Sequence, residues 1–104
     1  MKTSELMSAG EAELVPQLRA MKTKELERHA AKLLKKIGAE YSQVLAAVTK
    51  AVPQLGVEDN AFARIQQTVS LCGAANADKK IVERAAVIMM VIIKKQFLKI
   101  HSQS

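Results

Sequence analysis

Residues 85–93 read AAVIMMVII, nine successive apolar residues in a chain that elsewhere mixes apolar and charged positions. They lie between KKIVER and KKQFLKI, and the pattern predicts one helix over about residues 78–100. At 1.5 Å per residue this helix would be about 35 Å long. Its charged residues fall on one side of a helical wheel, but Val87, Val91 and Leu98 lie on that same side. A helix that is apolar all round has to be enclosed.

Three arrangements would enclose the middle of this helix. The rest of the same chain could wrap around it, a second copy could form a homodimer seam, or another protein or a membrane surface could cover it. Exposed apolar patches usually mark interfaces. We therefore name Val87, Val91 and Leu98 as candidate residues of a protein interface and predict a homodimer.

The N-terminal part of the chain predicts a helical but broken segment over residues 3–21. Gly10 and Pro16 interrupt it, and Ser8 with Glu11 has the S-x-x-E spacing of a capping box. Proline lacks the backbone N–H that a helix interior uses, so Pro16 is expected to end or kink this piece.

The middle of the chain predicts further helices. Residues 24–37 place apolar side chains on one arc, with Thr23 as a plausible N-cap and Gly38 as a left-handed C-cap. Residues 40–52 continue the apolar pattern, so the two stretches form either two helices or one helix bent at Gly38. A further helix follows within residues 57–72, after which Asn76 or Asp78 can cap the last one.

Composition supports an all-α fold. The chain has 104 residues, 49% of them hydrophobic, and only four glycines and two prolines, which leaves little turn material for a sheet. We predict a single domain over residues 1–104. It would be a small helical bundle of four principal helices with a broken N-terminal segment and a long apolar C-terminal helix.

The net charge of +6 is compatible with nucleic acid, an acidic protein or an anionic membrane as partner. Cys72 is the only cysteine, so no intramolecular disulfide can form, and the first residues lack the apolar core of a signal peptide. A cytoplasmic location is the resulting expectation. The nine-residue run is far shorter than the roughly twenty residues that span a bilayer, so no membrane span is expected.

Two surfaces are candidates for binding. Residues 30–48 resemble a helix-turn-helix with Gly38 at the turn, although Leu34 stands where a small residue is usual. A basic stripe precedes and overlaps this segment, and its ordinary interpretation is a solvated helix face. As candidates for contact with nucleic acid or an acidic partner we take the stripe and the polar residues of the second helix, namely Lys24, Arg28, Lys32, Lys35, Lys36, Ser42, Gln43 and Lys50.

The sequence offers little for catalysis. His29 and His101 have no Cys, Asp or Glu at a convincing metal spacing, and pairing of His29 with Glu25 on the surface is the expected role. Cys72 lies on an apolar helix face, as a buried small hydrophobic residue would. No phosphate-binding glycine loop or nucleophile elbow is present. We expect no enzyme activity, cofactor, metal or small-molecule substrate.

The leading expectation is a small basic regulatory or adaptor protein that acts through protein–protein contact on a helical surface. The alternative is a DNA-binding regulator that uses residues 30–50. The polar residues of the second helix are few for base recognition, which ranks the adaptor first.

Overall fold

The computed structural model describes residues 3–51, 61–74 and 76–102, and the side-chain surroundings of all of these except residues 11, 61 and 97–102. Every regular element in these ranges is a helix, which confirms the all-α prediction. The six helices are α1 (Thr3–Ser8), α2 (Glu11–Ala20), α3 (Thr23–Lys36), α4 (Tyr41–Ala51), α5 (Ala61–Cys72) and α6 (Lys79–Ser102). The Cα radius of gyration is 12.9 Å, close to the value of about 13 Å for a compact chain of this length.

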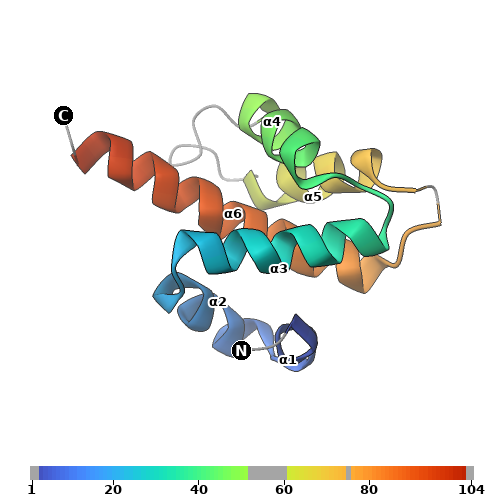
Figure 1. Cartoon of the computed structure of the whole chain (residues 1–104), viewed down its shortest axis with the longest axis horizontal. Helices are drawn as coiled ribbons and strands as arrows, with labels where there is room; N and C mark the ends of the chain where they lie inside the picture. The colour runs from blue at the N-terminus through green and yellow to red at the C-terminus, as the bar shows by residue number, and fades with distance from the viewer. Residues whose placement is uncertain (1–2, 52–60, 75, 103–104) are drawn as a thin grey trace.

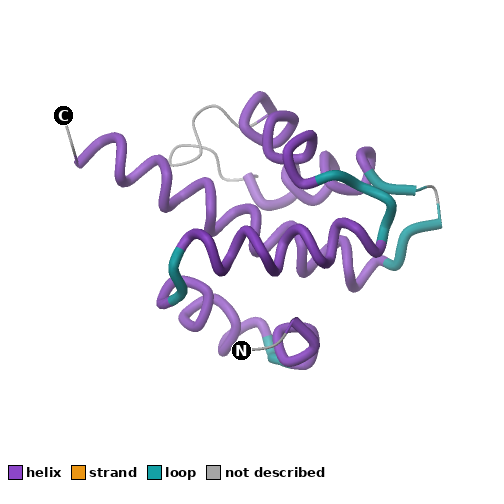
Figure 2. The backbone as a smooth tube through the Cα atoms, viewed as in Figure 1, coloured by secondary structure: helices purple, strands orange, loops and turns teal. Residues whose placement is uncertain are grey.

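The longest helix, α6, lies at the centre of the arrangement (Figure 1). It runs antiparallel to α3, with α4 and α5 on one side of this pair and α1 and α2 on the other. The α3–α4 turn and the α5–α6 loop lie at the same end of the molecule (Figure 2), where the backbone N–H of Ala74 donates to the carbonyl of Ile37 at 2.7 Å. A Cβ added to Gly73 would lie 3.1 Å from Cδ1 of Ile37, so a side chain at this position would require Ile37 to shift by a few tenths of an ångström.

The apolar run of α6 is enclosed by its own chain. Eight of its nine residues are buried, and the ninth, Met90, is half-buried. On the charged side of α6, Val87 is 7% exposed and Val91 is 3% exposed. Of the three arrangements considered above, the wrapping chain is the one that the structure contains. Val87 and Val91 are therefore buried without a second chain, so they no longer support a dimer seam. The side chain of Leu98 lies outside the described residues.

The N-terminal helices cover that charged side and are attached to it near both ends. The guanidinium of Arg84 donates to the carbonyl of Ala9, and the ammonium of Lys95 donates to the carbonyl of Met21. Between these two bonds, α2 packs against α6 through fully buried Leu14 and Leu18. The polar residues that flank the apolar run therefore position the helix that encloses it.

The N-terminal segment is broken near Gly10, as the sequence predicts, but it is not broken at Pro16. The break falls at Ala9 and Gly10, and Pro16 lies inside α2 without ending it. Burial of Leu14 and Leu18 on either side of the proline holds the helix together despite the missing N–H, an effect of tertiary packing. The predicted capping box is also wrong, because Gly10 is the N-cap of α2 and the Ser8 hydroxyl donates to the carbonyl of Ser4 at 3.2 Å.

Residues 24–52 form two helices, which decides between the two alternatives left open by the sequence. Gly38 separates α3 from α4 with a φ of 76°, the left-handed conformation expected of a C-cap. Thr23 is the first residue of α3, and Lys22 is its N-cap. At the start of α6, Asp78 is the capping residue, since its carboxylate accepts from the N–H of Lys80 at 2.8 Å.

Candidate functional site

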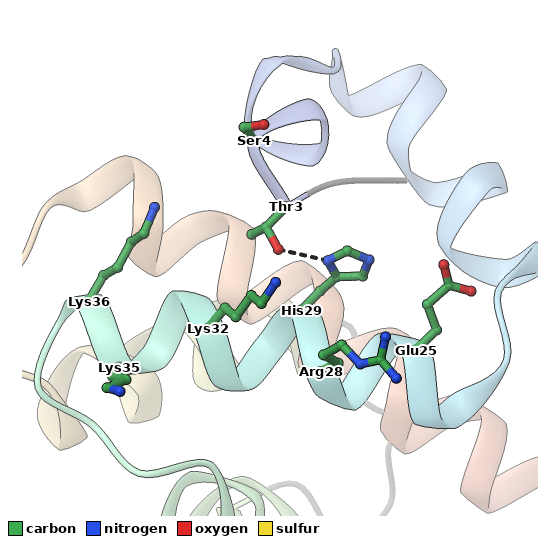
Figure 3. A pocket seen from close by; sticks show the side chains of 8 residues that line it. All are labelled: Thr3, Ser4, Glu25, Arg28, His29, Lys32, Lys35 and Lys36. Atoms are coloured by element: carbon green, nitrogen blue, oxygen red, sulfur yellow. Dashed lines mark hydrogen bonds between the residues drawn. The ribbon is translucent and has the colours of Figure 1, made fainter.

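A groove of about 770 Å³ lies between α1 and α3 (Figure 3). Its volume falls within the range of about 300–1,000 Å³ that is typical of ligand sites. The side chains of Lys32, Lys36 and Glu25 extend from α3 toward α1, which contributes the opposite wall. The lining consists of two hydroxyl residues from α1 and six residues from α3: Thr3, Ser4, Glu25, Arg28, His29, Lys32, Lys35 and Lys36.

The basic character of the groove follows from the amphipathic pattern of α3. Its apolar arc is buried against α6, so the charged residues on the opposite arc face outward, and four of them reach the groove. Within the described part of the chain these four cations have no carboxylate partner, and Glu25 is the one acid in the lining. Four cations and one carboxylate give the lining a net charge of +3 with His29 neutral. A recess lined by one sign of charge attracts the opposite sign.

His29 lies under the groove rather than on the surface, so the expected surface pair with Glu25 is wrong. The ring is 4% exposed, and its Nδ1 lies 2.9 Å from the hydroxyl oxygen of Thr3. The other ring nitrogen, Nε2, is buried and has no hydrogen-bond partner among the described residues. A buried polar atom without a partner usually costs about 1–3 kcal/mol. Among the described residues that line the groove, Nε2 is the side-chain polar atom that is buried without a hydrogen-bond partner.

Burial is also the largest influence on the protonation of His29. It lowers the pKa of the imidazole from its ordinary value, because the charged form loses its hydration. The carboxylate of Glu25 opposes this shift, whereas Lys32 and Arg28 add to it. The ring is therefore neutral near pH 7, and one of its two nitrogens carries a proton that can be donated.

Most of the predicted basic residues belong to this groove, but the residues predicted for DNA reading do not. Arg28, Lys32, Lys35 and Lys36 line it, whereas Lys24 is exposed outside it. The residues of α4 lie on the other side of α3 from α1 (Figures 1 and 3). The structure thus divides the predicted residues between two surfaces.

The second surface is the exposed face of α4. Ser42, Gln43 and Lys50 are exposed there, as a reading helix would require, and the Ser42 hydroxyl donates to the Glu40 carboxylate at 3.1 Å. At the start of α4, burial and the nearby carboxylate of Glu27 raise the pKa of Tyr41 to about 12. This phenol stays protonated at physiological pH.

The segment that resembles a helix-turn-helix does form two helices, α3 and α4, with Gly38 at the turn between them. Leu33, Ile37 and Val44 are buried at its apolar positions, and Leu34 is fully buried although it is larger than the residue usual there. The turn at Gly38 joins two helices that contact each other. These features are common to many helical bundles, so they describe the fold of this segment without assigning DNA binding to it.

Among the described residues, no group of three or more His, Cys, Asp or Glu side chains is placed to hold a metal ion. The helices in those ranges include none that is both long enough and apolar enough to cross a membrane. Cys72 is half-buried and carries a free thiol.

Comparison with known proteins gives no match to any family model, curated protein or solved structure. The function is therefore argued from the groove and the surface of this chain.

Sequence reasoning identified the cations of the groove but missed its other wall. Thr3 and Ser4 lie about twenty residues before the start of α3 in the sequence, and nothing in their local pattern indicates that α1 returns to this helix. For His29 a signal was present. It follows Leu26 by three residues and precedes Leu33 by four, which places it on the buried arc of α3.

Proposed function

We propose that this protein is a non-enzymatic adaptor or regulator that binds an acidic segment of a partner protein in the groove between α1 and α3. The observation that carries the proposal is the charge of the groove, where four cations and a single carboxylate surround a recess of about 770 Å³. Charge complementarity of this kind favours fast association and the correct choice of partner. The expected homodimer and the expected cytoplasmic location stay predictions.

The form of the groove favours a protein segment over a DNA duplex. A recess between two helices encloses a narrow ligand, and it lies on the side of α3 away from α4. A helix-turn-helix protein needs its reading helix and its phosphate-binding cations on one surface of the duplex. Four of the five stripe cations line the groove instead.

DNA binding through α4 is the second candidate function. It is favoured by the exposed side chains of Ser42, Gln43 and Lys50 and by the left-handed turn at Gly38. In that case α3 would contribute to backbone contact through Lys24 and the cations nearest the turn.

Two triple variants of equal charge test the proposal. Changing Lys32, Lys35 and Lys36 to Gln removes three cations from the groove. The control changes Arg19, Lys79 and Lys80 to Gln, and these three are exposed outside the groove. Association with a polyglutamate chain, followed by stopped flow at several salt concentrations, should slow by about tenfold in the groove variant. The control variant should stay near the wild-type rate.

Equal losses in both variants would show that net charge alone attracts the ligand, and the groove proposal would be wrong. The second candidate is tested with DNA duplexes of different sequence. Tight, sequence-dependent binding at physiological salt that is lost in Gln43→Ala would replace the adaptor with a DNA-binding regulator.

A further inference from the structure

We infer that the groove takes an acidic helix whose carboxylates are spaced one turn apart, and that one of these carboxylates accepts a hydrogen bond from His29 Nε2. This inference rests on the proposed function and specifies its partner.

The spacing of the cations carries the first part of the inference. Arg28, Lys32 and Lys36 follow one another at intervals of four residues along α3, and all three line the groove. Four residues of helix rise about 6 Å. Acidic side chains at positions i, i+4 and i+8 of a partner helix repeat at the same interval. A partner helix lying along α3 therefore pairs its carboxylates with these cations one to one.

His29 carries the second part. The Thr3 hydroxyl oxygen lies 2.9 Å from Nδ1. In the tautomer that the inference uses, this hydroxyl donates to Nδ1 and the proton of the neutral ring is on Nε2. That nitrogen is buried, without a partner, in a side chain that lines the groove. A carboxylate that accepts from it removes the cost of the unpaired donor. The same carboxylate is stabilised by the neighbouring charges of Arg28 and Lys32.

The groove also contains a carboxylate of its own. Glu25 precedes His29 by one helical turn, and its charge acts on the imidazole without a hydrogen bond to Nε2. An acidic ligand is repelled by the negative charge of this group. Removing the charge with Glu25→Gln should therefore tighten binding of the acidic helix by several-fold.

The test of spacing compares two alanine-based peptides of identical composition. One carries three glutamates at four-residue spacing, and the control carries the same glutamates at two-residue spacing. Calorimetry with the wild-type protein should show roughly tenfold tighter binding of the first peptide. Equal binding of the two peptides would overturn the inference and leave the proposed function standing, provided that the groove lysines are still needed. Failure of both peptides to bind would overturn both.

The test of His29 uses two substitutions that differ in one property. His29→Gln keeps an N–H donor near the position of Nε2 and should retain most of the affinity. His29→Leu fills similar space without a donor and should lose about tenfold. Circular dichroism shows whether each variant is folded, and in the wild type the Nε2 resonance should move when the spaced peptide is added. An unmoved resonance, or full affinity in His29→Leu, would overturn this role.

Competition with inorganic phosphate tests whether the groove prefers phosphate groups to carboxylates. Under the inference, phosphate competes with the spaced peptide only weakly, as a general anion would. Displacement of the peptide by phosphate at concentrations where acetate has no effect would assign the groove to phosphate groups and overturn the inference.

Discussion

The two N-terminal helices meet the rest of the molecule in different ways. Helix α2 packs closely on α6, where Leu14 and Leu18 are fully buried and Val87 is covered. Helix α1 also contacts α6 and buries Leu6, but on its α3 side it leaves a groove. The difference lies in the surfaces that they cover. The middle of α6 is apolar on every side, whereas the outer face of α3 carries charges whose burial would be too costly for a second helix to close over it.

The comparison has a functional meaning. Sealing an apolar face contributes to stability, and a charged face that cannot be sealed stays open to ligands. Variants on the α2 side should therefore affect the free energy of unfolding, and those on the α1 side should affect binding more than stability.

The largest effect is expected from Val91→Lys. It places an unpaired ammonium at a site that is 3% exposed, and such a change typically costs about 3–5 kcal/mol. Urea unfolding followed by circular dichroism measures the loss. The control is Leu71→Lys, at a side chain that is 79% exposed, where stability should stay nearly unchanged. Equal small effects would show that α2 does not seal α6.

A smaller loss is expected from Leu14→Ala. The side chain is fully buried between α2 and the core, and truncation of such a leucine costs about 2–4 kcal/mol. Val15→Ala, one position along the same helix, removes a half-buried side chain and should cost less. The difference between the two unfolding free energies measures how firmly α2 is packed. If Val15→Ala costs more than Leu14→Ala, the packing face of α2 is wrongly assigned.

A smaller loss still is expected from Thr3→Val on the α1 side. The substitution removes the hydroxyl that bonds to His29 Nδ1, and a side-chain hydrogen bond of this type contributes about 1 kcal/mol. Amide exchange should become faster in α1 and stay unchanged in α2. Ser8→Ala is the control, because the Ser8 hydroxyl bonds only within α1. Faster exchange in both helices would mean that the two open as one unit.

The smallest effect is expected in the pH dependence of stability. Burial lowers the pKa of His29 in the folded state, so the unfolded chain takes up a proton first as the pH falls. Stability should be level above about pH 6.5, the usual imidazole pKa, and should decrease below it toward the folded pKa. His29→Gln should remove this decrease when urea midpoints are compared. An identical pH profile in the variant would assign the decrease to other groups.

The parts of the fold set by local pattern were predictable. The expected helix over residues 24–37 corresponds to α3 (Thr23–Lys36), and that over 78–100 corresponds to α6 (Lys79–Ser102). The left-handed Gly38 was also predicted correctly. In each case the apolar period and the capping residues lie within one segment, so sequence order is enough to show them.

The features that depend on distant segments were not predictable in the same way. Pro16 was expected to end or kink a helix, because the cost of its missing N–H is visible in the sequence. The packing of Leu14 and Leu18, which lets α2 continue past it, is not visible there. His29 was assigned to the surface because its buried partner, Thr3, lies 26 residues away. The cations of the groove could be found from the sequence, but the recess exists only because α1 lies opposite them.

The bonds that attach the N-terminal helices to α6 have a consequence for how the chain folds. Arg84 bonds to Ala9 across 75 residues, and Lys95 bonds to Met21 across 74. During synthesis, α2 therefore leaves the ribosome long before the helix that it covers. Contacts of such high sequence separation form late and slow the folding reaction. Until α6 arrives, the apolar side chains of α2 have no α6 surface to pack against, and unpacked apolar surface of this kind favours aggregation.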